Sequence, residues 1–182
     1  MLRRRSRQPS DPLAGVDAAA LPPRWQRFVV DAVAARARWA ALVEGVRPGP
    51  LRDRLSALGD RVDQGVLAVW ETASRAAETE RVAATLDADA VTAEYKRARR
   101  DPDPDPALVE ALSARFRSMQ RILNAVEDAE ERLEVLDARL GAAVARAAEL
   151  ALTSGTEDEL GSELDGVVDE LGALRSSLDS LR

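Results

Sequence analysis

Cysteine and histidine are both absent from this chain of 182 residues, and each absence removes a class of chemistry. Without cysteine there can be no disulfide framework, thiolate metal site or cysteine nucleophile. Without histidine the chain lacks the commonest general base and metal ligand, which excludes Ser-His-Asp and Cys-His catalysis. We therefore expect a protein that is not an enzyme and that uses no metal and no cofactor.

Aromatic residues are also scarce, at 3% of the chain against 46% for all hydrophobic residues, so alanine, leucine and valine supply the apolar surface. A core of such residues packs helices closely and leaves little room for a small-molecule substrate. With 32% charged residues, the composition is typical of long helices or coiled coils. Only one of the 26 basic residues, Lys96, is lysine, an arginine bias typical of a GC-rich bacterial genome.

Long hydrophobic runs are missing as well. The first 15 residues combine arginine with proline, serine and aspartate where a signal peptide needs an apolar stretch. No window approaches the roughly 18 uncharged apolar residues of a membrane-spanning helix. We expect a cytoplasmic location. The net charge of −6 argues against nucleic acid as a partner, since phosphate binding requires clustered positive charge.

The order of helical patterns and breaks predicts an all-α fold: an antiparallel helical bundle with a long coiled-coil hairpin and a disordered N-terminal arm. A basic arm covers residues 1–22, where arginine and proline occur without periodicity. Residues 23–100 form an N-terminal helical segment of two long helices and one short one. An Asp-Pro spacer occupies residues 101–106, and a coiled-coil αα-hairpin occupies residues 107–182.

Proline, glycine and aspartate set the expected helix ends. Pro23 suits the first turn of the first helix, and RPGP at residues 47–50 ends it. The second helix begins at Leu51 and continues to about residue 86. Asp87 or Asp89 caps a short third helix that ends near residue 100.

The strongest periodicity lies in the last third of the chain. From residue 108 to residue 150 apolar positions alternate at spacings of four and three, and Arg115 is the one exception. TSG at residues 153–155 interrupts the pattern, Thr156 and Glu159 form a capping box, and the spacing resumes to residue 181. We predict a helix-association seam, either an intramolecular core or an interface, formed by Met119, Ile122, Val126, Leu133, Leu136, Leu140, Leu160, Leu164, Leu171, Leu174 and Leu178.

The stretch KRARRDPDPDP, residues 96–106, resembles a site but is better explained as a joint. Asp101, Asp103 and Asp105 have the spacing of the first ligands of a calcium loop. Such a loop needs glycine at position 6 and glutamate at position 12, where this chain has Pro106 and Leu112. The basic residues fit a helix C-terminus, and we interpret the Asp-Pro repeat as a stiff spacer.

A second candidate surface lies at the N-terminus. Arg3, Arg4 and Arg5 precede an amphipathic helix that carries Trp25, Phe28 and Trp39 on one face. Basic flanks beside such a face are typical of helices that lie on a membrane surface. The same stripe also suits a bundle core or a groove on a protein partner.

Two functions remain open at the level of sequence. The first is a non-enzymatic structural or adaptor protein that acts through coiled-coil association with itself or with a protein partner. The second is a peripheral membrane-associated regulator at the inner face of the membrane, using the basic N-terminus and the amphipathic first helix. In layout alone, an amphipathic start followed by a long helical hairpin is similar to the phage-shock protein A class of envelope-stress proteins. That resemblance implies binding to a membrane surface.

Overall fold

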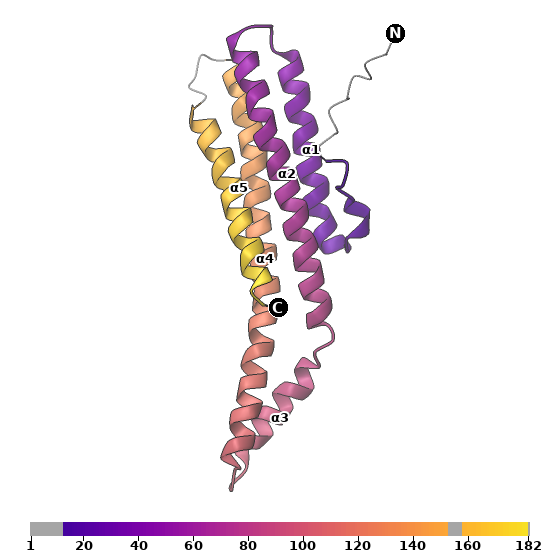
Figure 1. The fold of residues 1–182 in the computed structure, drawn as a ribbon, viewed down its shortest axis with the longest axis vertical. Helices are drawn as coiled ribbons and strands as arrows, with labels where there is room; N and C mark the ends of the chain where they lie inside the picture. The colour runs from indigo at the N-terminus through magenta and orange to yellow at the C-terminus, as the bar shows by residue number, and fades with distance from the viewer. Residues whose placement is uncertain (1–12, 153–157, 182) are drawn as a thin grey trace, which may run out of the picture.

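The computed structural model describes residues 13–152 and 158–181. Within these ranges the chain is predominantly helical and has no strand, so the predicted all-α bundle is confirmed (Figure 1). The elements are η1 (Ala18–Ala20), α1 (Pro23–Gly45), α2 (Pro50–Ala83), α3 (Ala88–Arg100), α4 (Pro106–Leu152) and α5 (Asp158–Asp179).

Proline and aspartate begin the helices, as predicted for Pro23 and Asp87, and α2 begins one residue before the predicted Leu51. Pro23, Pro50 and Pro106 are the first residues of α1, α2 and α4, where the missing amide proton has no helical acceptor to lose. The Asp87 side chain accepts a hydrogen bond from the Ala90 amide at 2.9 Å and caps α3. Between α1 and α2, Gly49 has a φ of 156°, a value that a side chain would strain. The Thr156 cap lies outside the described residues.

Four helices, α1, α2, α4 and α5, lie side by side and form the bundle (Figure 1). The helices α2 and α4 each pack against both α1 and α5. All four helices contribute to one continuous hydrophobic core, in which α4 runs antiparallel to α5. The pair α1–α2 and the pair α4–α5 therefore share one core, because each pair leaves an apolar face that the other pair covers.

Part of the N-terminal arm is ordered. Leu13 is only 9% exposed, and Val16, Ala18 and Leu21 pack against the core beside α1. The prediction of a disordered arm is thus wrong for residues 13–22, whose apolar side chains recur closely enough to cover the start of α1. Residues 1–12 lie outside the described ranges.

Beyond the bundle, α3 folds back against the first part of α4, and we call residues 88–122 the stalk (Figure 1). Val91 of α3 and Met119 of α4 are buried there, apart from the main core. The rings of Tyr95 and Phe116 stack with centroids 4.9 Å apart. The Asp-Pro spacer is the turn at the tip of the stalk, so it joins α3 to α4 and does not separate two packed halves.

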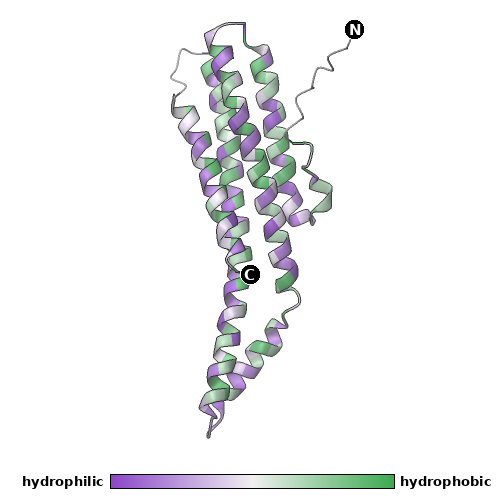
Figure 2. Cartoon of the chain, viewed as in Figure 1, coloured by the Kyte–Doolittle hydropathy of each residue, from purple (hydrophilic) through white to green (hydrophobic). Residues whose placement is uncertain are grey.

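Hydrophilic and hydrophobic residues mix along every helix (Figure 2). In the part of the chain that the structure describes, no helix is both long and apolar enough to cross a membrane.

Candidate interaction sites

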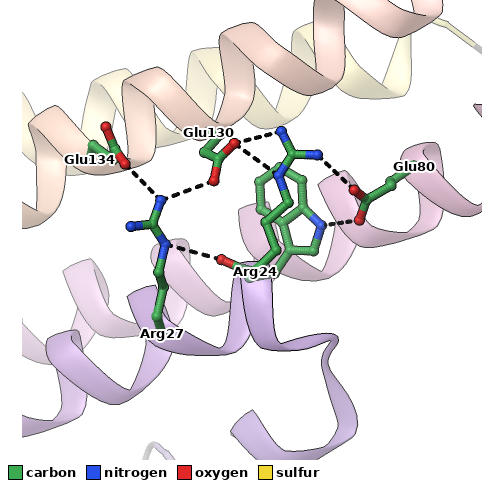
Figure 3. A network of polar contacts seen from close by, with 6 residues as sticks. Arg24, Arg27, Glu80, Glu130 and Glu134 are labelled. Atoms are coloured by element: carbon green, nitrogen blue, oxygen red, sulfur yellow. Dashed lines mark hydrogen bonds and ion pairs between the residues drawn. The ribbon is translucent and has the colours of Figure 1, made fainter.

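The most connected polar site joins three helices around Arg24 (Figure 3). Arg24 of α1 donates two hydrogen bonds to Glu130 of α4, at 2.8 and 2.5 Å, and one to Glu80 of α2 at 2.7 Å. Arg27, one turn further on, donates to Glu130 at 2.9 Å and to Glu134 at 2.6 Å. The Trp25 indole donates to Glu80 at 2.6 Å. We call these residues the Arg24 cluster.

Charge pairing shifts the pKa values in the Arg24 cluster away from neutral pH. Hydrogen bonds from Arg24 lower the pKa of Glu130, and the bond to Glu130 raises the pKa of Arg24. The bond to Glu134 likewise raises the pKa of Arg27. All three groups are therefore charged at neutral pH. Such permanently paired groups are suited to holding helices in register, and they are poorly suited to general acid–base chemistry.

Asp137 lies on α4, as Glu130 does, but its pKa shifts in the opposite direction. Burial raises the pKa of Asp137, and the negative charge of Asp31 on α1 raises it further, against the opposing effects of Arg38 and Arg27. Among the described residues no cluster of acidic side chains is arranged to hold a metal ion.

Further ion pairs fasten α5 to its neighbours. Arg61 and Arg75 of α2 pair with Asp165 and Asp179 of α5 at 2.8 and 2.5 Å. Arg139 of α4 pairs with Glu170 at 2.5 Å. The residue numbers of these two pairs increase together along α2 and α5, so the two helices run parallel. Two of these pairs thus join arginines of α2, in the N-terminal part of the chain, to aspartates of α5, in its C-terminal part.

The predicted association seam lies inside the single chain. Ten of its eleven members are buried, and Ile122, near the point where α4 leaves the bundle, is half-buried. Met119 belongs to the stalk and packs apart from the main core. The others lie in the main core: Val126, Leu133, Leu136, Leu140, Leu160, Leu164, Leu171, Leu174 and Leu178. These nine side chains face other parts of the same chain and are not exposed to a partner.

The three aromatic residues proposed for a membrane or partner surface are also internal. Trp25, Phe28 and Trp39 are each at most 3% exposed and belong to the main core. That face packs against α2 and α4, as the core alternative predicts, and is not a membrane or partner surface. Arg3, Arg4 and Arg5 lie outside the described residues.

In the stalk, apolar side chains at seam positions of α4 remain accessible. Leu108 is 51% exposed, and Leu112 and Ile122 are half-buried. Arg115 stands at a seam position between them and forms an exposed ion pair with Glu94 of α3 at 3.0 Å. The one charged residue in the seam therefore marks the part of α4 that has left the bundle, and this is the signal from which sequence reasoning could have located the stalk.

The acidic turn at the tip of the stalk uses its carboxylates locally. Asp101 accepts a hydrogen bond from the Asp103 amide at 3.0 Å, and Asp105 accepts one from the Ala107 amide at 2.9 Å. Asp105 therefore caps α4, and the basic residues before the turn occupy the last turn of α3, where the sequence predicts a helix C-terminus.

Comparison of the chain with protein-family models, with curated proteins and with solved structures finds no match. Function therefore has to be inferred from the surface and the chemistry of this chain.

Proposed function

We propose that this chain is a non-enzymatic structural or adaptor protein of the cytoplasm that binds a protein partner through helix–helix association. The bundle supplies a rigid body, and the stalk supplies the binding surface. The observation that carries the proposal is the change along α4, where Leu136 and Leu140 are buried but Leu108 is 51% exposed. An apolar residue kept at a seam position without a covering helix is suited to contact with another helix.

The geometry of the stalk fits such a contact. Leu108, Leu112 and Ile122 follow the spacing of the seam on the face that also carries Met119; α3 covers this face at Met119 and leaves Leu108, near the tip, 51% exposed. A partner helix lying along α4 would complete the layer of neighbours that α4 has inside the bundle. Coiled-coil pairing of this kind uses flanking charges to select the register. Arg115, 58% exposed at its side chain, is in place to do so.

Photo-crosslinking in the native host tests the proposal. A photoreactive phenylalanine analogue is placed at Leu108 in the stalk or, as a matched control, at Asp169 on the outer face of α5, which is also exposed. The expected result is a discrete crosslinked species from position 108 and none from position 169. Equal crosslinking at both positions, or none at positions 108, 112 and 122, would contradict the proposal.

The alternative, a peripheral membrane-associated regulator, is supported by fewer residues once the structure is considered. Its aromatic face is internal in the bundle, so membrane binding would depend on Arg3, Arg4 and Arg5. Co-sedimentation with anionic liposomes separates the two functions. Binding by the full chain that is lost when these three arginines become serine would favour the alternative, whereas absence of binding by the full chain would remove it.

A further inference from the structure

Trp25 and Trp39 both lie in the main core on α1, but only one of them has a hydrogen-bond acceptor for its indole N–H. The Trp25 N–H donates to Glu80 at 2.6 Å. The Trp39 N–H is buried and has no acceptor within the described residues, and the residue as a whole is 3% exposed. A buried donor of this kind destabilises the folded chain unless a bound molecule accepts its hydrogen bond.

Trp39 lies at an open groove between α1 and α2, which we call the Trp39 groove. The volume of about 530 Å³ is in the range of sites that hold small organic molecules. Trp39 and Val62 are buried and form the floor, and Ala40 and Val43 of α1 form an apolar wall. The groove therefore combines an apolar surface with an unpaired donor beneath it.

Gly59 of α2 leaves a space directly beside the unpaired indole N–H. A Cβ atom at Gly59 would lie 3.7 Å from the Trp39 Nε1 atom and, apart from the adjoining backbone, would have no other atom within 4 Å. That space would accept alanine, which is more stable than glycine within a helix, so packing does not explain the glycine. An oxygen atom in this space, about 1 Å nearer to the indole nitrogen, would be at hydrogen-bonding distance.

The charged residues of the Trp39 groove are only partly paired with one another. The Arg36 Nε atom lies 2.5 Å from the Asp63 Oδ1 atom, so these two charges balance. Arg52, Glu44 and Asp60 also line the groove, and they form no ion pair in the part of the chain that the structure describes. A ligand that complements the groove therefore needs charges of both signs.

We propose that the Trp39 groove binds a small zwitterion of the amino-acid class. A carboxylate oxygen of the ligand occupies the space beside Gly59 and accepts the hydrogen bond of the Trp39 N–H, while Arg52 balances the carboxylate charge. The ammonium group of the ligand faces Glu44 and Asp60, and its side chain lies on the apolar wall. A phosphate or a simple carboxylate would meet these two acids without a compensating positive charge, so the groove selects the zwitterion.

This inference goes beyond the proposed function, because it concerns another part of the molecule. The connection between α1 and α2, near which the groove lies, is at the end of the bundle opposite the stalk (Figure 1). Crosslinking through Leu108 and ligand binding at Trp39 can therefore each succeed or fail without the other.

Proton–nitrogen NMR of the full chain tests the inference, because each of the three tryptophans contributes one indole N–H signal. The signal that is lost in Trp39→Phe belongs to Trp39. The probes are free amino acids, added singly at about 5 mM, at which a ligand with a Kd of ~1 mM would be mostly bound. Acetate and methylammonium, which each carry one of the two charges, are the controls. We expect at least one amino acid to shift the Trp39 signal downfield, with a Kd about 10-fold or more below that of acetate.

Substitutions locate the ligand in the groove. Gly59→Ala should abolish the shift, because its methyl group takes the space of the carboxylate oxygen. Gly166→Ala on α5, where a Cβ atom would meet nothing within 4 Å, is the matched control and should leave the Kd unchanged. Arg52→Ser should weaken binding by about 10-fold, whereas Arg132→Ser, at an exposed arginine of α4, should not weaken it. Circular dichroism verifies that each variant is folded.

Three results would overturn the inference. If no amino acid shifts the Trp39 signal, the groove holds water and no ligand of this class. If acetate binds as tightly as the amino acids, the two acids do not select a zwitterion. If the shift persists in Gly59→Ala, the carboxylate does not occupy the space beside the Trp39 N–H.

Discussion

The two parts of α4, one inside the bundle and one in the stalk, carry the same apolar spacing but have different surroundings. In the bundle the seam residues Leu133, Leu136 and Leu140 are covered by α1, α2 and α5. In the stalk, α3 is the neighbouring helix, and Leu108 remains half in solvent. A heptad pattern therefore predicts that a helix has an apolar face, but the number of neighbouring helices decides how far that face is buried.

The same contrast applies to charges. The Arg24 cluster is partly buried and joins three helices, and its charged side chains are between 26% and 54% exposed. The pair between Arg115 and Glu94 in the stalk joins only two helices and is more exposed than Arg24 and Glu130. We expect the bundle to determine global stability and the stalk to respond locally to substitution.

The largest expected effect on stability comes from replacing a leucine in the bundle part of α4, and a leucine in the stalk part provides the comparison. Leu140→Ala removes a side chain that is 1% exposed and should lower the free energy of unfolding by about 3–5 kcal/mol. Leu112→Ala, at a half-buried stalk position, should cost less than about 1.5 kcal/mol. Chemical denaturation of both variants measures the difference, and equal losses would mean that the stalk is as well packed as the bundle.

Local opening of the stalk gives an effect of intermediate size. Phe116→Ala removes the ring that stacks on Tyr95, a contact that helps to hold α3 against α4. Amide hydrogen exchange in α3 should accelerate by about 10-fold, with α2 unchanged, because α3 can detach without unfolding the core. Trp70→Phe, a conservative change at a partly buried ring of α2, is the control. Uniform acceleration in all helices would show that α3 unfolds only with the bundle.

Much of the fold follows from local chemistry that the sequence displays. Pro23 and Asp87 begin helices where expected, and α2 begins within one residue of the expected position, because proline and aspartate act on the chain next to them. The seam was likewise predictable as apolar. Its role was not, since a 4-3 spacing is the same whether the covering helix comes from this chain or from another.

The errors have a shared physical cause. Leu13 and Val16 looked isolated within a polar arm, but the packed core offers them an apolar surface. Trp25 looked suited to a membrane, but its indole N–H has an acceptor in Glu80, which lies 55 residues away. The Arg24 cluster escaped sequence reasoning altogether, because its acids come from α2 and α4 and only the packed bundle brings them together. Interactions between distant residues decide which of several suitable surfaces a side chain meets.

The smallest expected effect compares the two kinds of ion pair. Glu130→Gln should lower the free energy of unfolding at pH 7 by about 1 kcal/mol, because Arg24 and Arg27 both lose a charged acceptor in a partly buried site. Glu94→Gln in the stalk should cost less than about 0.5 kcal/mol, because exposed pairs are weak.

The pH dependence of stability shows whether the charge of Glu130 stabilises the folded protein. The folded protein lowers the pKa of Glu130, so the stabilisation is complete above the unfolded value of about 4.3 and is lost as the pH falls through the lower, folded value. The original chain should therefore lose stability more steeply below about pH 5 than Glu130→Gln does, and the two curves should converge in acid. Thermal unfolding between pH 7 and pH 3 measures both curves. Parallel curves would show that the charge of Glu130 contributes nothing, and that the Arg24 cluster is no stronger than the exposed pair of the stalk.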